Sequence, residues 1–103
     1  PVQAVVLPIA ERHEAYARAL EEKLRAAGLR SAVDLGREKV GKKIRDAELQ
    51  KVPLILVVGD KEVERGTAAL RLHGQGDKGE VDLAGFIDKA VALNRQKSLS
   101  LNF

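Results

Sequence analysis

The chain has 103 residues, enough for one packed domain, and 18 Lys and Arg against 15 Asp and Glu give it a net charge of +3. A hydrophobic content of 45% predicts a folded domain rather than a disordered segment. The chain has no cysteine, few aromatic residues and no apolar run near the roughly 20 residues of a membrane span. These features exclude disulfides, thiolate chemistry, a platform of stacked aromatic rings and a transmembrane helix.

Charge and cysteine content also bear on partners and location. A net charge of +3 favours a weak attraction to polyanions over a protein that coats DNA. The absence of cysteine is compatible with the reducing cytoplasm, where we expect the protein to act. Because the sequence starts at Pro1 and enters an apolar run at once, we expect a piece of a longer polypeptide.

The first half of the chain alternates short apolar runs with segments of helical periodicity. The apolar runs predict strands buried on both faces, as in a parallel sheet. Apolar residues three and four positions apart predict amphipathic helices, and Gly28 and Pro53 are placed to end them. The predicted elements are strands at 3–7 and 30–35 and helices at 11–27 and 40–51.

In the second half, the unbroken apolar run LILVV at 54–58 predicts the strand at the centre of the sheet. The pair Gly59–Asp60 predicts a turn, and residues 67–72 predict a shorter strand. Three glycines make 73–79 a flexible hairpin or loop. Asp82 is expected to cap a last helix.

The order of these elements predicts the fold class. Strands that alternate with helices form a mainly parallel sheet with right-handed crossovers, and closely spaced later strands add an antiparallel edge. We therefore expect a three-layer α/β domain over residues 1–93. From residue 94 the periodicity fades, so residues 94–103 are predicted to be a tail.

The chain shows no catalytic constellation. His13 is predicted to lie in a solvated first turn of the first helix, and His73 to be a solvated turn residue, with contact to a phosphate as the alternative. No serine is flanked as G-x-S-x-G requires, and HGQGDKG lacks the strand-to-helix context of a dinucleotide site. An enzyme acting on a small molecule would have no base–nucleophile pair, and no spacing of ligands predicts a metal site.

A basic segment at 36–51 is the first feature that favours a function. Helical spacing places Lys39, Lys42 and Arg45 on a stripe opposite the apolar positions of the predicted helix. Such a stripe can contact nucleic-acid phosphates, which position a protein without reading sequence. An ordinary charged helix with internal ion pairs is the alternative.

The second feature is GDKEVERG at 59–66, directly after the central strand. If the first three strands take the order 2-1-3, a crevice opens where they end, between Pro8–Ile9 and Gly59–Asp60. Glu62 would then lie beside a crevice rather than on a helix. A carboxylate there can accept hydrogen bonds from the edge of an unstacked guanine, and a plain acidic turn is the alternative.

Nearly the whole chain resembles the anticodon-binding domain of class II threonyl-, prolyl-, histidyl- and glycyl-tRNA synthetases, and the threonyl type most of all. The resemblance begins with PVQAVVLPI and runs through the helix that ends in AAGLR. It is strongest in DLGREKVGKKIRDAELQKVPLILVVGDKEVERG, a run that is long and specific.

This resemblance implies a five-stranded mixed sheet with three helices that receives the anticodon loop. The base-reading glutamate and arginine of the threonyl type fall on Glu62 and Arg71, and the basic helix face falls on Lys43 and Arg45. Arg37 stands where the family usually has a base-reading asparagine, and His73 where it has a second arginine. Base discrimination is therefore open at these two positions.

The resemblance further implies a part of a threonine–tRNA ligase whose catalysis belongs to other domains. ATP, Mg²⁺ and Zn²⁺ are expected only there, and none of them in this chain. We expect the anticodon stem-loop of a tRNA as partner, neither DNA nor a membrane, and a homodimeric parent enzyme. The alternative is a paralogue used for protein interaction or non-selective RNA binding, with an apolar patch at Leu99, Leu101 and Phe103.

Overall fold

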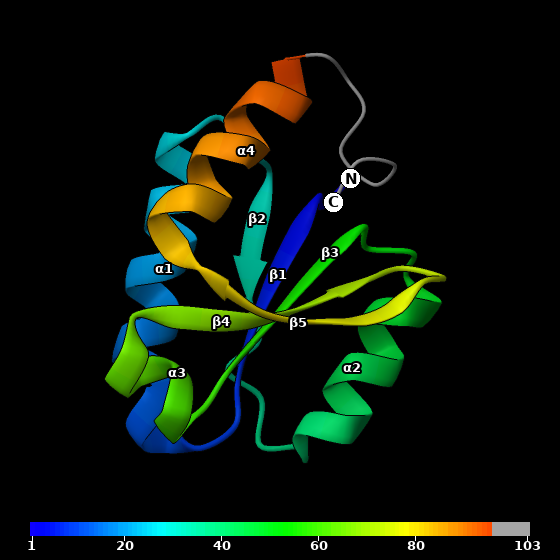
Figure 1. Cartoon of the computed structure of the whole chain (residues 1–103). Helices are drawn as coiled ribbons and strands as arrows, with labels where there is room; N and C mark the ends of the chain where they lie inside the picture. The colour runs from blue at the N-terminus through cyan, green and yellow to red at the C-terminus, as the bar shows by residue number, and fades with distance from the viewer. Residues whose placement is uncertain (96–103) are drawn as a thin grey trace.

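The computed structural model describes residues 1–95 as one α/β unit (Figure 1). Its strands are β1 Ala4–Pro8, β2 Ser31–Val33, β3 Leu54–Val58, β4 Thr67–Leu72 and β5 Gly76–Asp82. Its helices are a 3-10 turn η1 Glu11–His13, followed by α1 Glu14–Ala26, α2 Val40–Leu49, α3 Asp60–Arg65 and α4 Leu83–Arg95.

The five strands form one sheet in the order β2-β1-β3-β4-β5. Strand β1 pairs in parallel with β2 and β3, whereas β4 pairs antiparallel with β3 and β5. The register between β4 and β5 shifts after Leu70, which faces Gly79, so that Arg71 faces Asp77 and Lys78 is the extra residue. The mixed five-stranded sheet with an antiparallel edge confirms the predicted fold class.

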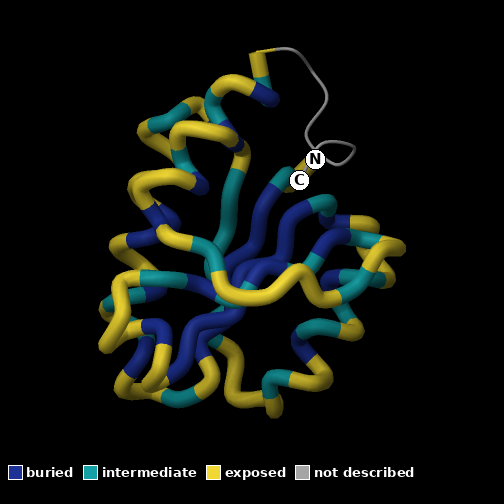
Figure 2. The backbone as a smooth tube through the Cα atoms, viewed as in Figure 1, coloured by how far each residue is buried: buried dark blue, intermediate teal, exposed yellow. Residues whose placement is uncertain are grey.

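Helices cover both faces of the sheet and give the molecule its three layers (Figure 1). Helices α1 and α4 pack on one face over the larger core, which includes Leu20, Leu24 and Phe86. Helix α2 packs on the other face over a smaller core around Leu7 and Ile55. Strands β1 and β3 are buried along their whole length, while β5 is mostly exposed (Figure 2).

Local signals place the ends of the helices as the sequence predicts. Gly28 adopts a φ of 94° after α1, and the N–H of Leu29 then donates to the Leu24 carbonyl at 3.1 Å. At α4, the Asp82 carboxylate accepts a hydrogen bond from the Gly85 N–H at 3.2 Å, as an N-cap does.

Two predictions about the elements are wrong, and one is right only in part. Residues 60–65, expected to begin as a turn, form helix α3, because Glu62 caps the helix start and Gly66, at a φ of 69°, ends it. The hairpin predicted as one of two alternatives at 73–79 is present, but residues 76–79 already belong to its second strand β5, because the β4 ladder supplies partners to a segment with little strand propensity. The structure thus has one α-helix more than the three expected.

Helix α4 continues through Arg95, so Asn94 and Arg95 are helical where the sequence predicts the start of the tail. The boundary at 93 stays a prediction, and the apolar tail positions Leu99, Leu101 and Phe103 lie outside the described residues. Over residues 1–95, every helix is too short or too polar to cross a membrane.

Candidate nucleic-acid interface

One side of the sheet, which we call the α2 face, carries most of the residues predicted to contact RNA. Strand β4 alternates buried residues with half-buried ones such as Ala69 and Arg71. Ala69 packs against the core under α2, so Arg71, two residues further on, lies on the same side of the sheet. Helix α2 and the segment before it carry Arg37, Lys39, Lys42, Lys43 and Arg45. Arg71 and the cations of α2 therefore lie on the same side of the sheet.

Arg71 has a donor that the described part of the chain leaves unused. Its Nε is buried and has no hydrogen-bond partner there. A buried donor without a partner typically costs about 1–3 kcal/mol and is uncommon in folded proteins. An acceptor from outside the chain, such as an oxygen of a base or a phosphate, would reach this buried Nε only after a movement of the Arg71 side chain.

Glu62 lies in the first turn of α3 and is buried, with 8% of its surface exposed. Its Oε1 accepts a hydrogen bond of 2.8 Å from the N–H of Gly59, which caps the helix. The expectation that Glu62 lies off any helix is therefore wrong. The cap uses Oε1, so a donor from a ligand would meet Oε2.

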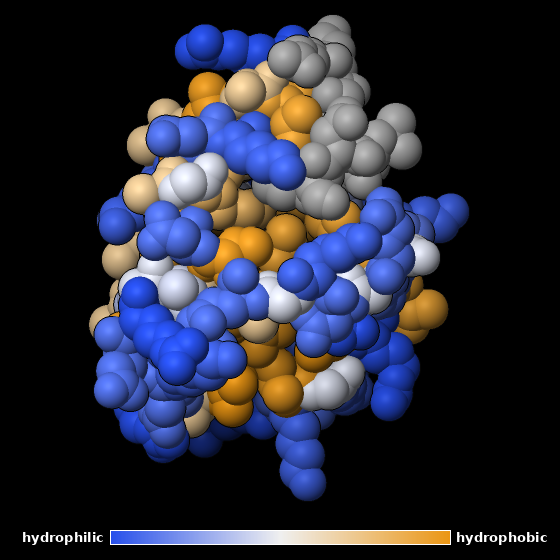
Figure 3. Space-filling view, viewed as in Figure 1, coloured by the Kyte–Doolittle hydropathy of each residue, from blue (hydrophilic) through white to orange (hydrophobic). Residues whose placement is uncertain are grey.

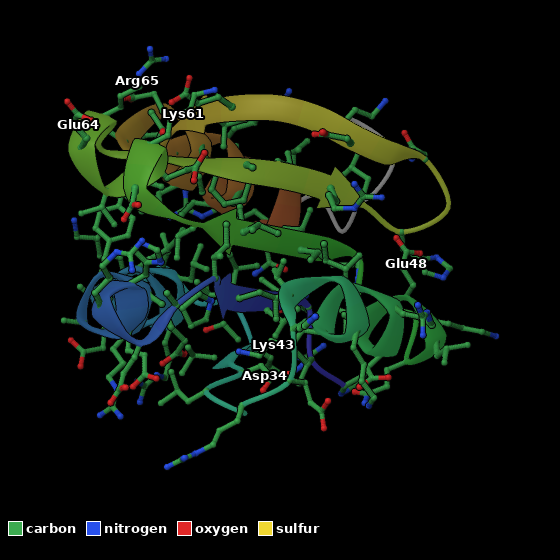
Figure 4. All side chains as sticks on the ribbon, turned by 90° about the horizontal axis from the view of Figure 1, so that it is seen from below. Asp34, Lys43, Glu48, Lys61, Glu64 and Arg65 are labelled. Atoms are coloured by element: carbon green, nitrogen blue, oxygen red, sulfur yellow. The ribbon has the colours of Figure 1, made fainter. Side chains whose placement is uncertain are left out.

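Among the basic residues predicted on α2, Lys43 is not accessible. Lys43 is 5% exposed, and its Nζ donates to the Asp34 carbonyl at 3.0 Å and the Pro8 carbonyl at 3.5 Å (Figure 4). Lys42 forms an ion pair of 3.2 Å with Asp46, which raises the pKa of Lys42 through that hydrogen bond. Lys39 and Arg45 are exposed, so they remain with Lys42 as the accessible cations.

A hollow of about 360 Å³ lies where the first two strands end. Its walls are the segments after β1 and β2, including Ile9 and Arg37, with Lys43 at its side. The predicted second wall at Gly59 is wrong, because Ile9 fills that space: a Cβ added to Gly59 would lie 2.7 Å from Ile9 Cδ1. The crevice opens between β1 and β2 instead.

Side chains of η1 and α3 are joined by Arg12, His13 and Asp60, which we call the Asp60 clamp. The sequence did not predict contacts of Arg12 or Asp60 and placed His13 in solvent. The Arg12 guanidinium donates to both Asp60 oxygens, from Nε at 2.8 Å and from Nη2 at 2.7 Å. These hydrogen bonds, followed by that of His13, hold the pKa of Asp60 far below its ordinary range. No local pattern could reveal the clamp, because its halves lie 48 residues apart.

His13 is the buried member of the clamp, 3% exposed, and its predicted solvated position is wrong. The N–H of Ala10 donates to His13 Nδ1 at 3.0 Å, so Nδ1 is the acceptor nitrogen. The proton of the neutral ring then lies on Nε2, which donates to Asp60 Oδ1 at 2.6 Å. The imidazole thus serves as a bridge between backbone and carboxylate.

The second histidine lies at the other end of the sheet, just after β4. His73 Nε2 is 3.9 Å from Glu48 Oε2 of α2, and its backbone N–H donates to the Pro53 carbonyl. The ring is partly exposed, in agreement with the predicted turn position. Contact with a phosphate there stays a prediction.

Two further cations line the edge where α3 meets β5 (Figure 4). Arg65 Nη1 and Lys61 Nζ lie 3.0 Å and 3.9 Å from Glu80 Oε1. The Thr67 hydroxyl, with Arg65, lowers the pKa of Glu80. Among residues 1–95, no group of three or more His, Cys, Asp or Glu side chains is arranged to hold a metal ion.

Comparison with known proteins agrees with this layout. Residues 3–93 match the family model described as the anticodon binding domain. The chain belongs to this family. The match extends from the start of β1 to the last turns of α4, so it includes every predicted contact residue.

The curated relatives that this chain matches include threonine–tRNA ligases. The enzyme of Symbiobacterium thermophilum is 58% identical over 99 residues, which are 96% of this chain and 15% of that protein. The enzyme of Pelodictyon phaeoclathratiforme is 52% identical over 89 residues, or 86% of this chain and 14% of that protein. The chain thus spans about one seventh of the length of these relatives.

Solved structures show the same fold. The RNA binding domain of threonyl-tRNA synthetase from Cryptosporidium parvum has a TM-score of 0.81 and 30% identity, covering 86% of this chain and 22% of that one. Histidyl-tRNA synthetase from a Nostoc species has a TM-score of 0.82 at 23% identity over 94% of this chain and 23% of its own, which shows the fold alone. The resemblance inferred from the sequence is confirmed.

Proposed function

We propose that this chain binds the anticodon stem-loop of a tRNA as the anticodon-binding part of a threonine–tRNA ligase. The observation that carries the proposal is the 58% identity, over 96% of the chain, to one such ligase. The α2 face supports it, because accessible cations and a buried donor without a partner in the described chain lie on one side of the sheet.

In this proposal the contacts divide into two kinds. Lys39, Lys42 and Arg45 attract the phosphates and position the loop without reading it. Arg71 and Glu62 read base edges, the first by donating from Nε and the second by accepting at Oε2, as a carboxylate can from a guanine. Arg37, beside the hollow, is the third candidate for base reading.

Lys43 has a different role in this proposal. Because its ammonium is bound to the carbonyls of Pro8 and Asp34, it fixes the end of β1 and the segment after β2 against α2. Lys43 would therefore hold in place the segment that carries Arg37, and would not itself contact a phosphate.

The proposal extends to a longer protein. Aminoacylation would belong to other domains, together with ATP, Mg²⁺ and Zn²⁺, and the whole enzyme would be a homodimer in the cytoplasm. The present chain would supply selection of the tRNA, which requires no catalytic residue of its own.

An NMR titration at low salt tests the proposal. The labelled chain is titrated with the anticodon stem-loop of a threonine tRNA and with a scrambled loop of equal length and charge. We expect larger shifts with the threonine loop, clustered at Glu62, Arg71 and residues 39–45. Equal shifts with both loops would reject base reading, and no shift with either at millimolar RNA would reject RNA binding.

A further inference from the structure

Asp60 ties the start of α3 to the segment after β1 through side-chain hydrogen bonds. Helix α3 has six residues, too few to be stable without tertiary contacts. Asp60 is its first residue and Glu62 its third, so a movement of one carries the other. Whatever fixes Asp60 therefore also fixes the direction of the Glu62 carboxylate.

The attachment consists of several contacts from the segment after β1. Arg12 holds both oxygens of Asp60, His13 holds one of them, and the ring of His13 is itself fixed by the Ala10 N–H. Ile9 packs over Gly59, so a Cβ added there would lie 2.7 Å from Ile9 Cδ1 and would have to displace that methyl group. These contacts leave the α3 start little freedom to rotate.

Two observations favour a positioning role of the clamp over a contribution to stability alone. Arg12 and Asp60 are both 68% exposed, and exposed ion pairs contribute little to the free energy of unfolding. Yet the geometry is bidentate, and it includes a histidine that is almost fully buried. Bidentate hydrogen bonding gives directional specificity as well as attraction.

We infer that Arg12 and His13 are positioning residues for base reading: through Asp60 they fix α3 in the orientation in which Glu62 presents Oε2 to RNA. This inference rests on the proposed function, since it takes Glu62 as a base reader. Neither Arg12 nor His13 touches the base. Their effect is on the discrimination between loops, not on the attraction of RNA in general.

A double-mutant cycle tests the inference. For the 103-residue chain and its variants, Kd is measured for the threonine stem-loop and for a loop with one anticodon base replaced. The discrimination is the Kd of the altered loop divided by the Kd of the threonine loop. We expect Asp60→Ala to lower this ratio by about threefold to tenfold, and Asp60→Asn, which keeps an oxygen acceptor, by less. In a chain that already carries Glu62→Ala, Asp60→Ala should lower the ratio no further.

Matched variants separate positioning from folding. Arg12→Ala should also lower the ratio, whereas Arg25→Ala should not change it, although Arg25 makes a similar two-contact pair with Glu21 and is 64% exposed. Amide spectra of each variant show that it is folded. Binding to the mismatched loop should stay near the wild-type value in all of them.

The failures are distinguishable. If Glu62→Ala lowers the ratio but Asp60→Ala and Arg12→Ala do not, the clamp has no positioning role. The same conclusion follows if Asp60→Ala acts equally with and without Glu62. If the wild-type chain binds both loops alike, the proposed function itself is wrong, and the inference with it.

Discussion

The parallel and the antiparallel halves of the sheet differ in how deeply their strands are buried. In the parallel half, β1 is buried along its whole length between β2 and β3. In the antiparallel half, β4 is half-buried and β5 is mostly exposed. Figure 3 shows apolar side chains in the hollow between β5 and α4, where Leu70, Val81 and Phe86 line a space of about 400 Å³. The centre of the sheet is packed on both faces, whereas the antiparallel edge leaves part of its side chains accessible.

The largest expected effect tests the stable half. Leu7→Ala in β1 removes a fully buried side chain from the core under α2, and should lower the free energy of unfolding by about 2–5 kcal/mol. The matched change Val81→Ala in β5 should cost less than about 1.5 kcal/mol, because Val81 is half-buried. Urea denaturation measures both, and equal losses would contradict the comparison.

The next effect concerns binding from the antiparallel half. Arg71→Met keeps the apolar stem but removes the buried Nε, which has no partner in the described chain. It should cost about 1–3 kcal/mol of discrimination between threonine and altered loops. The free energy of unfolding should stay the same or rise, because a buried unsatisfied donor is removed. A loss of stability equal to the loss of binding would show that Arg71 is structural.

A smaller effect tests whether the edge strand depends on glycine. Gly79 has a φ of 83°, next to the irregular register, and nothing in the structure blocks a Cβ at that position. Gly79→Ala should therefore cost about 1–2 kcal/mol from backbone strain alone. Thermal unfolding measures it, with Gly41→Ala in α2 as the opposite control, expected to stabilise by up to about 1 kcal/mol.

The smallest effect is visible only in acid. The depressed pKa of Asp60 means that its ionised form stabilises the fold fully above its ordinary pKa of 3.8, and that this contribution is lost as the pH falls toward the lower pKa of the folded state. Asp60→Asn should therefore flatten the decline of the free energy of unfolding between about pH 4 and pH 2. Parallel declines for both proteins would show that the clamp carries no such linkage.

The same contrast explains what the sequence could predict. The strands β1 and β3 are unbroken apolar runs, so their burial can be predicted from the local sequence alone. Strand β5 has glycines and charges and exists because β4 offers hydrogen bonds, which no local pattern records. Helix α3 was missed for a related reason, since a six-residue polar segment depends on its cap and its clamp.

The candidate site was predictable only in part. The resemblance located Arg71, Glu62 and the basic helix, but not which atoms remain available for a ligand. Lys43 follows Val40 by three residues and precedes Ala47 by four, so helical spacing alone would have placed it on the inner side. The Asp60 clamp could be predicted only from the parallel pairing of β1 with β3, which brings the segments after these two strands together.

The irregular register between β4 and β5 limits how this hairpin can vary in length. If the ladder continued evenly from the pair Leu70–Gly79, Lys78 would stand across from Arg71. The extra residue replaces it with Asp77 and so exchanges a repelling neighbour for an attracting one. Deleting one residue from this turn would therefore act as a charge reversal next to Arg71, although no charged side chain had been mutated.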